Sequence, residues 1–229
     1  MCAFKKILIF IAFFIAFEKN VYATKEVKIM EGYVPTIVED IIPADSAVRP
    51  GVVVEKKKYV VIHNTGNPVP TATAKAHAAY LHSLCNDPVR QVSWHYTVDD
   101  KEIYHHVPDN ENAWHASDGS YGEGNFYGIG IEICVNGFPG KYDGAEYEAW
   151  LPTFKQTLRN AAYLTAKLMK ENDIDIDGVK QHYDFARDKK NCPMQMRYTS
   201  ISRSYTRDNG DMWRYFIAEV KKEYDKLEA

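Results

Sequence analysis

Cysteine is scarce in this sequence, with 4 in 229 residues, and so sparse a set does not form the disulfide framework of a small secreted scaffold. Low-complexity tracts and internal repeats are also absent, which excludes a disordered chain and a repeat array. The net charge is −3, and the lack of a basic excess argues against nucleic-acid binding as the main function. With 45% hydrophobic residues, the chain is predicted to fold around a core of its own.

The apolar run over residues 7–17 is too short to span a membrane, because a helix needs about 20 residues to do so. The run follows Lys5 and Lys6 and precedes the small-residue sequence Val21-Tyr22-Ala23, a pattern typical of a secretory signal peptide over residues 1–23. An uncleaved anchor is the alternative interpretation. We therefore expect export to the periplasm or the extracellular space, without stable membrane insertion after cleavage.

The rest of the chain is predicted to form one domain preceded by a short extension. Residues 24–50 are the N-terminal extension, which lacks a long periodic pattern and ends at the turn signal Arg49-Pro50-Gly51. Residues 51–229 have a length that suits a single domain with a substantial core. We expect the domain to be a monomer.

Hydrophobic patterns predict strands that alternate with helices. Short β-branched runs are expected as strands, and two of them flank the polar connection Asp99-Asp100-Lys101 of a hairpin. The predicted strands cover residues 59–62, 92–98, 102–107 and 129–135. The predicted helices cover residues 71–84, 151–169 and 213–224, and residues 112–124 form a long surface loop. This order indicates an α/β fold with a central mixed β-sheet covered by helices.

Two imidazoles and one thiol are the first candidates for chemistry. His63 follows the first predicted strand, and His182 and Cys192 lie ten residues apart near the end of a later element. Such a set is typical of a zinc site, and three protein ligands leave a fourth tetrahedral position open to water. Because the three residues do not form a tight local motif, ordinary surface histidines and a buried thiol are the alternative on spacing alone.

Glu132 is the only charged residue in the apolar strand predicted over residues 129–135. Burial of a charge is unfavourable unless the charge is paired, hydrogen-bonded or close to a metal. A carboxylate beside a metal-activated water would be a natural general base. The alternative is a glutamate on the solvent face of an edge strand. The sequence also leaves open whether Cys85 and Cys134 form a disulfide.

Five blocks of the sequence resemble the type 2 N-acetylmuramoyl-L-alanine amidases, whose fold is shared by endolysin amidases and peptidoglycan recognition proteins. The blocks follow the family's order and extend over most of the chain after the signal. They are residues 59–65, 92–100, 112–115, 128–134 and 182–193, the last of which ends in Cys192-Pro193. Five blocks in order make a far more specific match than any one of them.

The resemblance implies an amidase/peptidoglycan-recognition-protein-like fold and a zinc amidase catalytic domain over residues 51–229. The implied reaction is hydrolysis of the amide bond between N-acetylmuramic acid and L-alanine in bacterial peptidoglycan, with Zn²⁺ as the cofactor. One alternative is a non-catalytic peptidoglycan-binding receptor of the same fold. Another is a zinc amide hydrolase that acts on a small acylated peptide.

Carried over residue by residue, the resemblance implies that His63, His182 and Cys192 are the zinc ligands. Glu132 matches the acid/base of the family, and Lys190 matches an active-site lysine that stabilises the oxyanion. Because the segment between His182 and Cys192 is longer than in the family's endolysins, Lys189 is the alternative lysine. The expected substrate-binding residues are Asn64, Trp94, His95, Trp114 and His115, of which His95 is alternatively a hydrogen-bonded core histidine.

Overall fold

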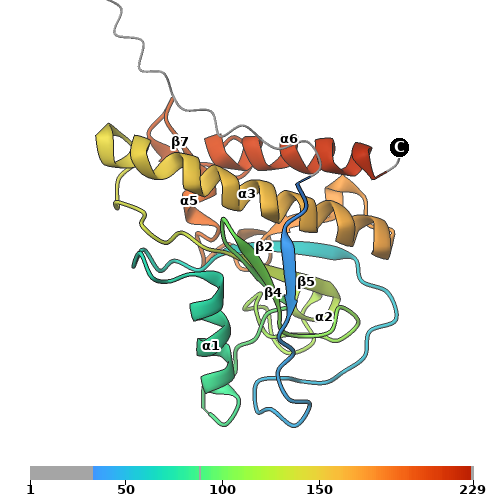
Figure 1. Cartoon of the computed structure of the whole chain (residues 1–229). Coiled ribbons are helices and arrows are strands. Elements are labelled where there is room, and N and C mark those ends of the chain that lie inside the picture. The colour runs from blue at the N-terminus through green and yellow to red at the C-terminus, as the bar shows by residue number, and fades with distance from the viewer. Residues whose placement is uncertain (1–32, 88, 228–229) are drawn as a thin grey trace, which may run out of the picture.

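A computed structural model describes residues 33–87 and 89–227 (Figure 1). Six strands form the main sheet in the order β1-β4-β3-β5-β2-β6. These strands are β1 (Thr36–Glu39), β2 (Tyr59–Asn64), β3 (Tyr96–Val98), β4 (Glu102–His105), β5 (Gly128–Ile133) and β6 (Val179–Gln181). The helices are α1 (Ala74–Leu84), α2 (Glu123–Tyr127), α3 (Gly144–Asn172), the 3₁₀ helix η1 (Ile176–Gly178), α4 (His182–Phe185), α5 (Met194–Arg197) and α6 (Asp211–Lys226). A separate ribbon pairs β7 (Tyr198–Thr199) with β8 (Ser204–Tyr205).

The main sheet is mixed, which confirms the predicted fold class. Only β3 and β4 pair antiparallel among these six strands, and they form the predicted hairpin. The remaining neighbours pair in parallel, including β2 with both β5 and β6. The strand β5 therefore lies inside the sheet between β3 and β2, where both of its edges are hydrogen-bonded.

Two long helices cover one face of the sheet. In Figure 1, α3 and α6 lie side by side above the strands, and α1 lies on the opposite side. The 29-residue α3 is helical because its apolar residues recur at helical spacing, and Phe154, Leu158 and Leu168 pack against the sheet. The same core includes Phe216 and Val220 from α6. This layer therefore fixes which side chains of the strands point into the core and which point away from it.

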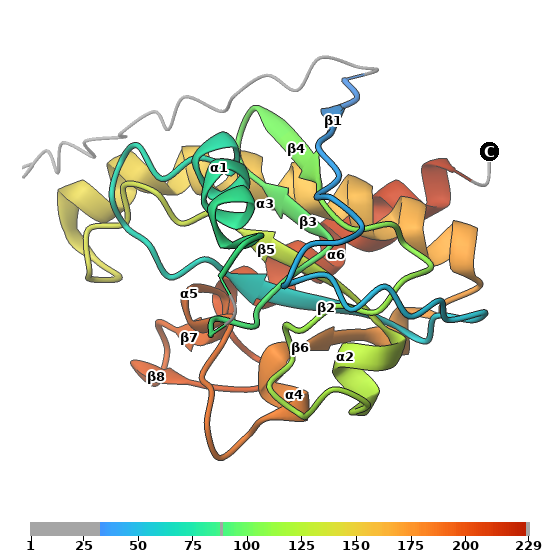
Figure 2. The same ribbon diagram turned by 90° about the horizontal axis from the view of Figure 1, so that it is seen from below.

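Part of the predicted N-terminal extension is built into the domain. The strand β1 extends the sheet by pairing with β4, as Figure 2 shows at the edge of the sheet. Ile42 and Val48 then join a second apolar cluster with Leu81, Leu84 and Trp94. The predicted signal peptide, residues 1–23, and residues 24–32 lie outside the described residues.

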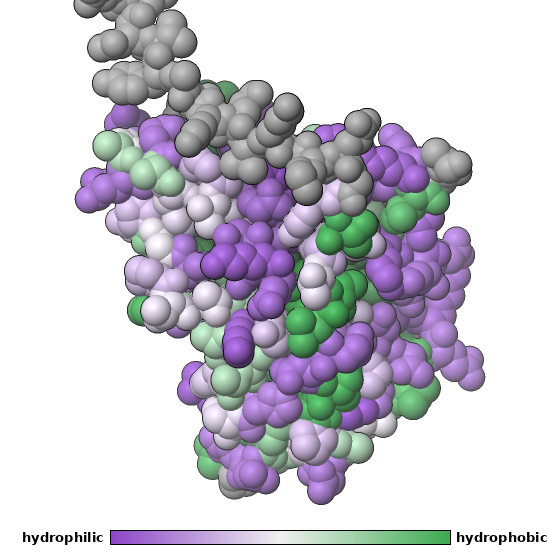
Figure 3. Space-filling model, in the orientation of Figure 1, coloured by the Kyte–Doolittle hydropathy of each residue, from purple (hydrophilic) through white to green (hydrophobic). Residues whose placement is uncertain are grey.

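None of the helices in the described part of the chain is long and apolar enough to cross a membrane. Figure 3 shows one face of the molecule, on which polar residues dominate and apolar residues form a narrow, interrupted strip. Such a strip is ordinary for the surface of a globular protein.

Candidate metal centre and active site

Strand register brings three of the candidate residues together. His63 on β2 lies opposite Glu132 on β5, and Ile62 lies opposite Gln181, the last residue of β6. His182 follows Gln181 directly as the first residue of α4. Because β5, β2 and β6 are parallel neighbours, their carboxyl ends meet at one edge of the sheet, which is where open α/β sheets place ligand sites.

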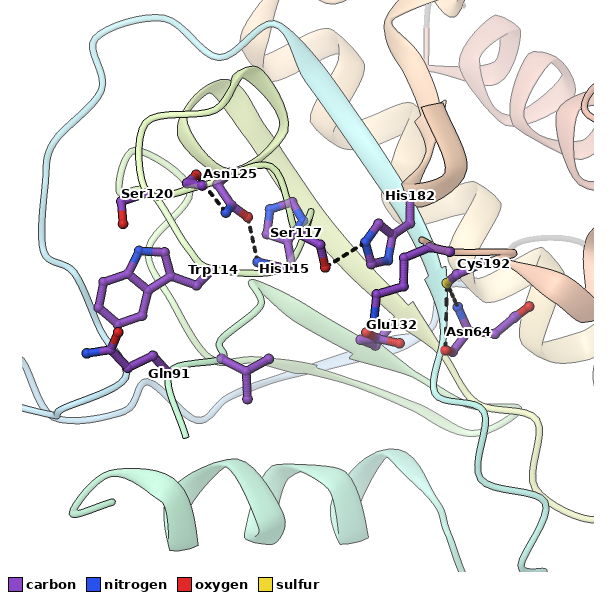
Figure 4. Close-up of a pocket in the computed structure, with 13 residues that line it drawn as sticks. Asn64, Gln91, Trp114, His115, Ser117, Ser120, Asn125, Glu132, His182 and Cys192 are labelled. Carbon is purple, nitrogen blue, oxygen red and sulfur yellow. Dashed lines mark hydrogen bonds between the residues drawn. The ribbon is translucent and has the colours of Figure 1, made fainter. Parts of the chain in front are cut away.

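Alternation along the strands sends these side chains away from the α3 and α6 layer. Ile62, Ile131 and Ile133 point into the core beneath those helices. Successive side chains of a strand point to opposite faces, so His63 and Glu132 point to the other face. There they meet the loop that precedes α2, together with His182 and Cys192 (Figure 4).

The third candidate ligand, Cys192, reaches this edge of the sheet through a closed loop. The backbone N–H of Tyr183 donates to the carbonyl of Cys192 at 2.9 Å, which joins the two ends of the loop over residues 183–192. The Arg197 guanidinium lies 3.6 Å above the centre of the Tyr183 ring and also bonds to the side chain of Asn191. The Sγ of Cys192 accepts a hydrogen bond from the backbone N–H of Asn64 at 3.2 Å.

The three predicted metal ligands form one compact cluster. Ligand atoms of His63, His182 and Cys192 all lie within 4.8 Å of one another. The two Nδ1 atoms of the histidines are 3.0 Å apart. Two imidazole nitrogens and a sulfur at this spacing fit the donor set of a zinc site.

Outer partners orient both histidine rings. The Nε2 of His63 lies 3.0 Å from Nδ1 of His115, and the Nε2 of His182 lies 3.2 Å from the hydroxyl of Ser117. If each Nε2 donates to its partner, both Nδ1 atoms direct lone pairs toward each other, and a cation between them would relieve that repulsion. Metal-binding histidines in proteins have this kind of second hydrogen bond.

The protonation states also fit a metal site. Burial and the neighbouring His182 hold the pKa of His63 well below its ordinary value, and burial lowers the pKa of His182 to about 4. Both imidazoles are therefore neutral near pH 7, as metal ligands must be. Burial raises the pKa of the Cys192 thiol, and a bound cation would offset this by stabilising the thiolate.

Glu132 lies beside the cluster as a carboxylate in an apolar setting. One of its oxygens, Oε1, is 3.9 Å from Nδ1 of His63, and the other has no hydrogen-bond partner among the described residues. Burial raises the pKa of Glu132 to about 8, and the positive charge of Lys190 acts to lower it. Because β5 is an interior strand, the interpretation of Glu132 as a surface residue on an edge strand is wrong.

A cavity of about 530 Å³ opens next to the cluster. Figure 4 shows Glu132, His182 and Cys192 at one end of it, and Trp114 and Gln91 at the other. Its lining consists of Asn64, Gln91, Val92, Trp114, His115, Ser117, Gly119, Ser120, Asn125, Glu132, His182, Lys190 and Cys192. Lys190, and not Lys189, is therefore the lysine that lines the cavity.

The structure separates the five predicted substrate-binding residues into two groups. Asn64, Trp114 and His115 line the cavity. His95 does not, because it is fully buried and both of its ring nitrogens bond to the backbone, at the carbonyl of Glu111 and the N–H of Gly130. The prediction that His95 contacts substrate is wrong, and its alternative as a core histidine is correct.

Trp94 also lies in the core. Its indole Nε1 donates to the Thr97 hydroxyl at 2.7 Å, and its ring packs in the second apolar cluster. The prediction that Trp94 binds substrate is therefore wrong as well. Cys85 and Cys134 are free thiols, which excludes a disulfide between them in this structure.

The cavity residues that were not predicted from the sequence include Gln91, Ser117 and Asn125. Ser117 is in the loop that the sequence predicts over residues 112–124, and the richness of that loop in Gly and Ser is the only local signal for it. Asn125 is the third residue of α2, and its role depends on contacts to residues nine and ten positions earlier.

The fold and the His-His-Cys cluster at the sheet edge define an amidase-like α/β protein. A family model described as N-acetylmuramoyl-L-alanine amidase matches residues 54–195, and the chain belongs to this family. The resemblance inferred from the sequence blocks is thereby confirmed.

Curated relatives include two N-acetylmuramoyl-L-alanine amidases of Bacillus subtilis (strain 168). CwlH is 40% identical over 161 residues, which cover 70% of this chain and 56% of that protein. XlyA is 41% identical over 160 residues, which cover 70% of this chain and 47% of that protein. The chain thus spans about half the length of these relatives.

Solved structures show the same fold. The catalytic domain of XlyA aligns with a TM-score of 0.62 and 37% identity, over 81% of this chain and 99% of that one. The structure of PlyL aligns with a TM-score of 0.59 and 27% identity, over 82% of this chain and 97% of that one.

Proposed function

We propose that this protein is a zinc-dependent N-acetylmuramoyl-L-alanine amidase. It would hydrolyse the amide bond between N-acetylmuramic acid and L-alanine in bacterial peptidoglycan. The observation that carries this proposal is the cluster of His63, His182 and Cys192 with the carboxylate of Glu132 beside it, at one end of an open cavity. The names of the curated relatives support the same reaction.

The residues of the site would have two roles in the reaction, which are metal binding and proton transfer. Zinc bound by His63, His182 and Cys192 would supply a Lewis acid for the amide carbonyl and for water. Glu132 takes the proton of the attacking water and returns it to the leaving nitrogen of L-alanine. Glu132 would have its raised pKa lowered by a cation at the cluster, which would favour the ionised carboxylate that accepts the proton.

Lys190 and the far end of the cavity would act on the substrate itself. The ammonium of Lys190 stabilises the negative charge that develops on the carbonyl oxygen. The indole of Trp114 offers an apolar face at the opposite end of the cavity, where a sugar ring or a peptide can stack. The cavity thus has room for groups on both sides of the bond that is cut.

A non-catalytic receptor of the same fold is the main alternative. Such a receptor needs a groove but no metal and no acid/base. Cys192 completes the donor set, and Glu132 lies next to it in a place where an unpaired carboxylate is unfavourable. Both features favour hydrolysis over recognition alone.

We further propose that the protein is exported as a monomer, to the periplasm or the extracellular space, after removal of residues 1–23. The partner would be bacterial peptidoglycan and not a nucleic acid. The basic start at Lys5 and Lys6, the apolar run over residues 7–17 and the small-residue cleavage site support export.

Metal content and product analysis test the proposal together. The chain without residues 1–23 is analysed for metal by mass spectrometry, and the release of L-alanine amino ends from purified peptidoglycan is measured with and without chelator. One zinc per chain and chelator-sensitive release are expected. Zinc-free protein that releases nothing would favour the receptor. Activity on soluble muropeptides but not on intact wall would favour the hydrolase of small acylated peptides.

A further inference from the structure

A single buried amide holds the loop that supplies the outer partners of the histidine cluster. Asn125 on α2 is 4% exposed. Its Oδ1 accepts hydrogen bonds from the backbone N–H groups of His115 and Ala116 at 2.7 and 2.6 Å. Its Nδ2 donates to the carbonyl of Gly119 at 3.0 Å (Figure 4). The side chain thus bonds to both arms of one loop.

The two backbone N–H groups that Asn125 binds belong to His115 and Ala116, which lie directly before Ser117 in the chain. His115 is the partner of His63, and Ser117 is the partner of His182. Ala116 separates them in the chain, so any shift of this segment moves both partners at once. One amide is therefore connected, through one loop, to the orientation of both histidine rings.

The loop needs such support because its own backbone does not favour this conformation. Ser117 has a φ of 60°, in the left-handed region that residues other than glycine rarely adopt. Backbone conformations of this kind persist only where surrounding contacts impose them. The hydrogen bonds of Asn125 are contacts of that type on Ala116, which lies immediately before Ser117, and on Gly119, which lies two residues after it.

Asn125 is itself fixed by its surroundings. The carboxylate of Asp118 accepts hydrogen bonds from the backbone N–H groups of Gly124 and Asn125 at 2.6 and 3.3 Å. The helix α2 also packs directly on the loop. A Cβ at Gly124 would lie 2.5 Å from that of Ala116, so only glycine permits this close approach. The backbone that carries the amide is thus held against the loop.

We propose that Asn125 is a positioning residue of the metal centre, which sets the affinity and geometry of the metal by holding His115 and Ser117 against His63 and His182. This inference rests on the proposed function only in requiring that a metal binds at the cluster. Outer partners of metal ligands change affinity by about 10- to 100-fold when they are lost. Removal of the Asn125 amide is expected to have an effect in the same range.

The test measures metal binding directly. Affinities of the purified protein for Zn²⁺ are determined by competition with a chelator, and the absorption spectrum of the Co²⁺ form reports ligand geometry. Asn125→Ala is expected to weaken Zn²⁺ binding about 10- to 100-fold and to change the Co²⁺ spectrum. Asn125→Asp keeps an oxygen that can accept both N–H bonds but replaces the donor to the Gly119 carbonyl by an oxygen, so its affinity is expected to lie between those of the wild type and Asn125→Ala.

Asn160→Ala is the matched control. Asn160 is also a buried amide, 1% exposed, and it bonds to the carbonyl of Asp99 and to Gln156 from α3, whose helix covers the opposite face of the sheet. The Asn160→Ala substitution removes side-chain hydrogen bonds of a buried amide at a place away from the cluster. The Zn²⁺ affinity of this variant is expected to stay at the wild-type value. Hydrogen exchange at residues 113–119 should accelerate only in the Asn125 variants.

The outcomes separate this inference from the proposed function. Wild-type affinity and an unchanged Co²⁺ spectrum in Asn125→Ala would overturn the positioning role, as would an equal loss in Asn160→Ala. If Asn125→Ala does not fold, an Asn125→Asp variant with wild-type affinity and an unchanged Co²⁺ spectrum also overturns it. A wild-type protein that binds neither metal would overturn the proposed function, and the inference with it.

Discussion

The ion pair between Arg49 and Glu111 should contribute to the free energy of unfolding, because it joins the N-terminal segment to the folded domain. The guanidinium donates to both carboxylate oxygens at 2.7 and 2.6 Å and to the carbonyl of Ile42 at 2.7 Å. The two side chains are only 10% and 13% exposed. Backbone bonds between residues 52–54 and residues 110–112 flank the pair. Arg49 lies outside the region that the family model matches.

Arg49→Met removes the charge and all three hydrogen bonds at similar volume. The carboxylate of Glu111 is then left mostly buried without its cation, and loss of one partner of a buried pair costs about 3–5 kcal/mol. Because each side chain keeps about a tenth of its exposure, we expect a value near the lower limit, about 3 kcal/mol. The double variant Arg49→Met, Glu111→Met removes both charges, which is close to neutral in itself. We expect it to cost about 1–2 kcal/mol because the carbonyl of Ile42 loses its donor.

Urea unfolding of the four proteins in this cycle measures the coupling. The double variant should be more stable than the sum of the single variants predicts, by about 2 kcal/mol or more. Lys167→Met is the control, because Lys167 and Glu171 form an exposed pair on α3 that should contribute below about 0.5 kcal/mol. A loss under about 1 kcal/mol in Arg49→Met, or additive single losses, would refute the assignment of this segment to the stable domain.

Three further predictions concern the site and the N-terminal half. Glu132→Gln should retain zinc while kcat falls by about two decades or more, and turnover like that of the wild type would contradict its role. Lys190→Ala should lower kcat by about 10- to 100-fold, whereas Lys189→Ala should change kcat little. Equal losses in the two variants would contradict the assignment of Lys190 as the active-site lysine. Burial lowers the pKa of His105, but hydrogen bonds to two carboxylates outweigh this and raise it above the ordinary value. The stabilisation by His105 is therefore fully present below about pH 6.5 and lost as the pH rises through the raised pKa. His105→Gln should thus lower the free energy of unfolding more at about pH 5.5 than at about pH 8, and the opposite order would contradict the sign of the shift.

Elements with a strong hydrophobic pattern could be predicted from the sequence, and short strands without a turn signal could not. The predicted helices over residues 71–84, 151–169 and 213–224 correspond to α1, α3 and α6, because apolar residues at helical spacing bury one face. The strands β1 and β6 have four and three residues and lack a turn signal that joins them to a neighbouring strand, so they were missed. Strands so short have no alternation to detect, and their pairing partners are distant in sequence. The strands β3 and β4 are equally short, but the polar connection between them identifies a hairpin.

The candidate site was predictable in its residue types but not in its surroundings. His63, His182 and Cys192 were singled out by chemistry and by resemblance, and the structure brings them together. Their proximity depends on the order β5-β2-β6, which no local spacing encodes. His95 was misassigned for the same reason, since the groups that satisfy its ring come from residues 111 and 130.

Gly130 on β5 is a position where the needs of the site and of the strand differ. Glycine weakens a strand, yet Gly130 lies two residues before Glu132 on the face that carries the site. A Cβ at Gly130 would lie 2.7 Å from the ring of His115, closer than real Cβ atoms approach other groups. The missing side chain therefore makes room for His115 to reach His63. The strand tolerates this glycine because β2 and β3 hydrogen-bond to β5 on both edges and the isoleucines on its other face pack under α3 and α6.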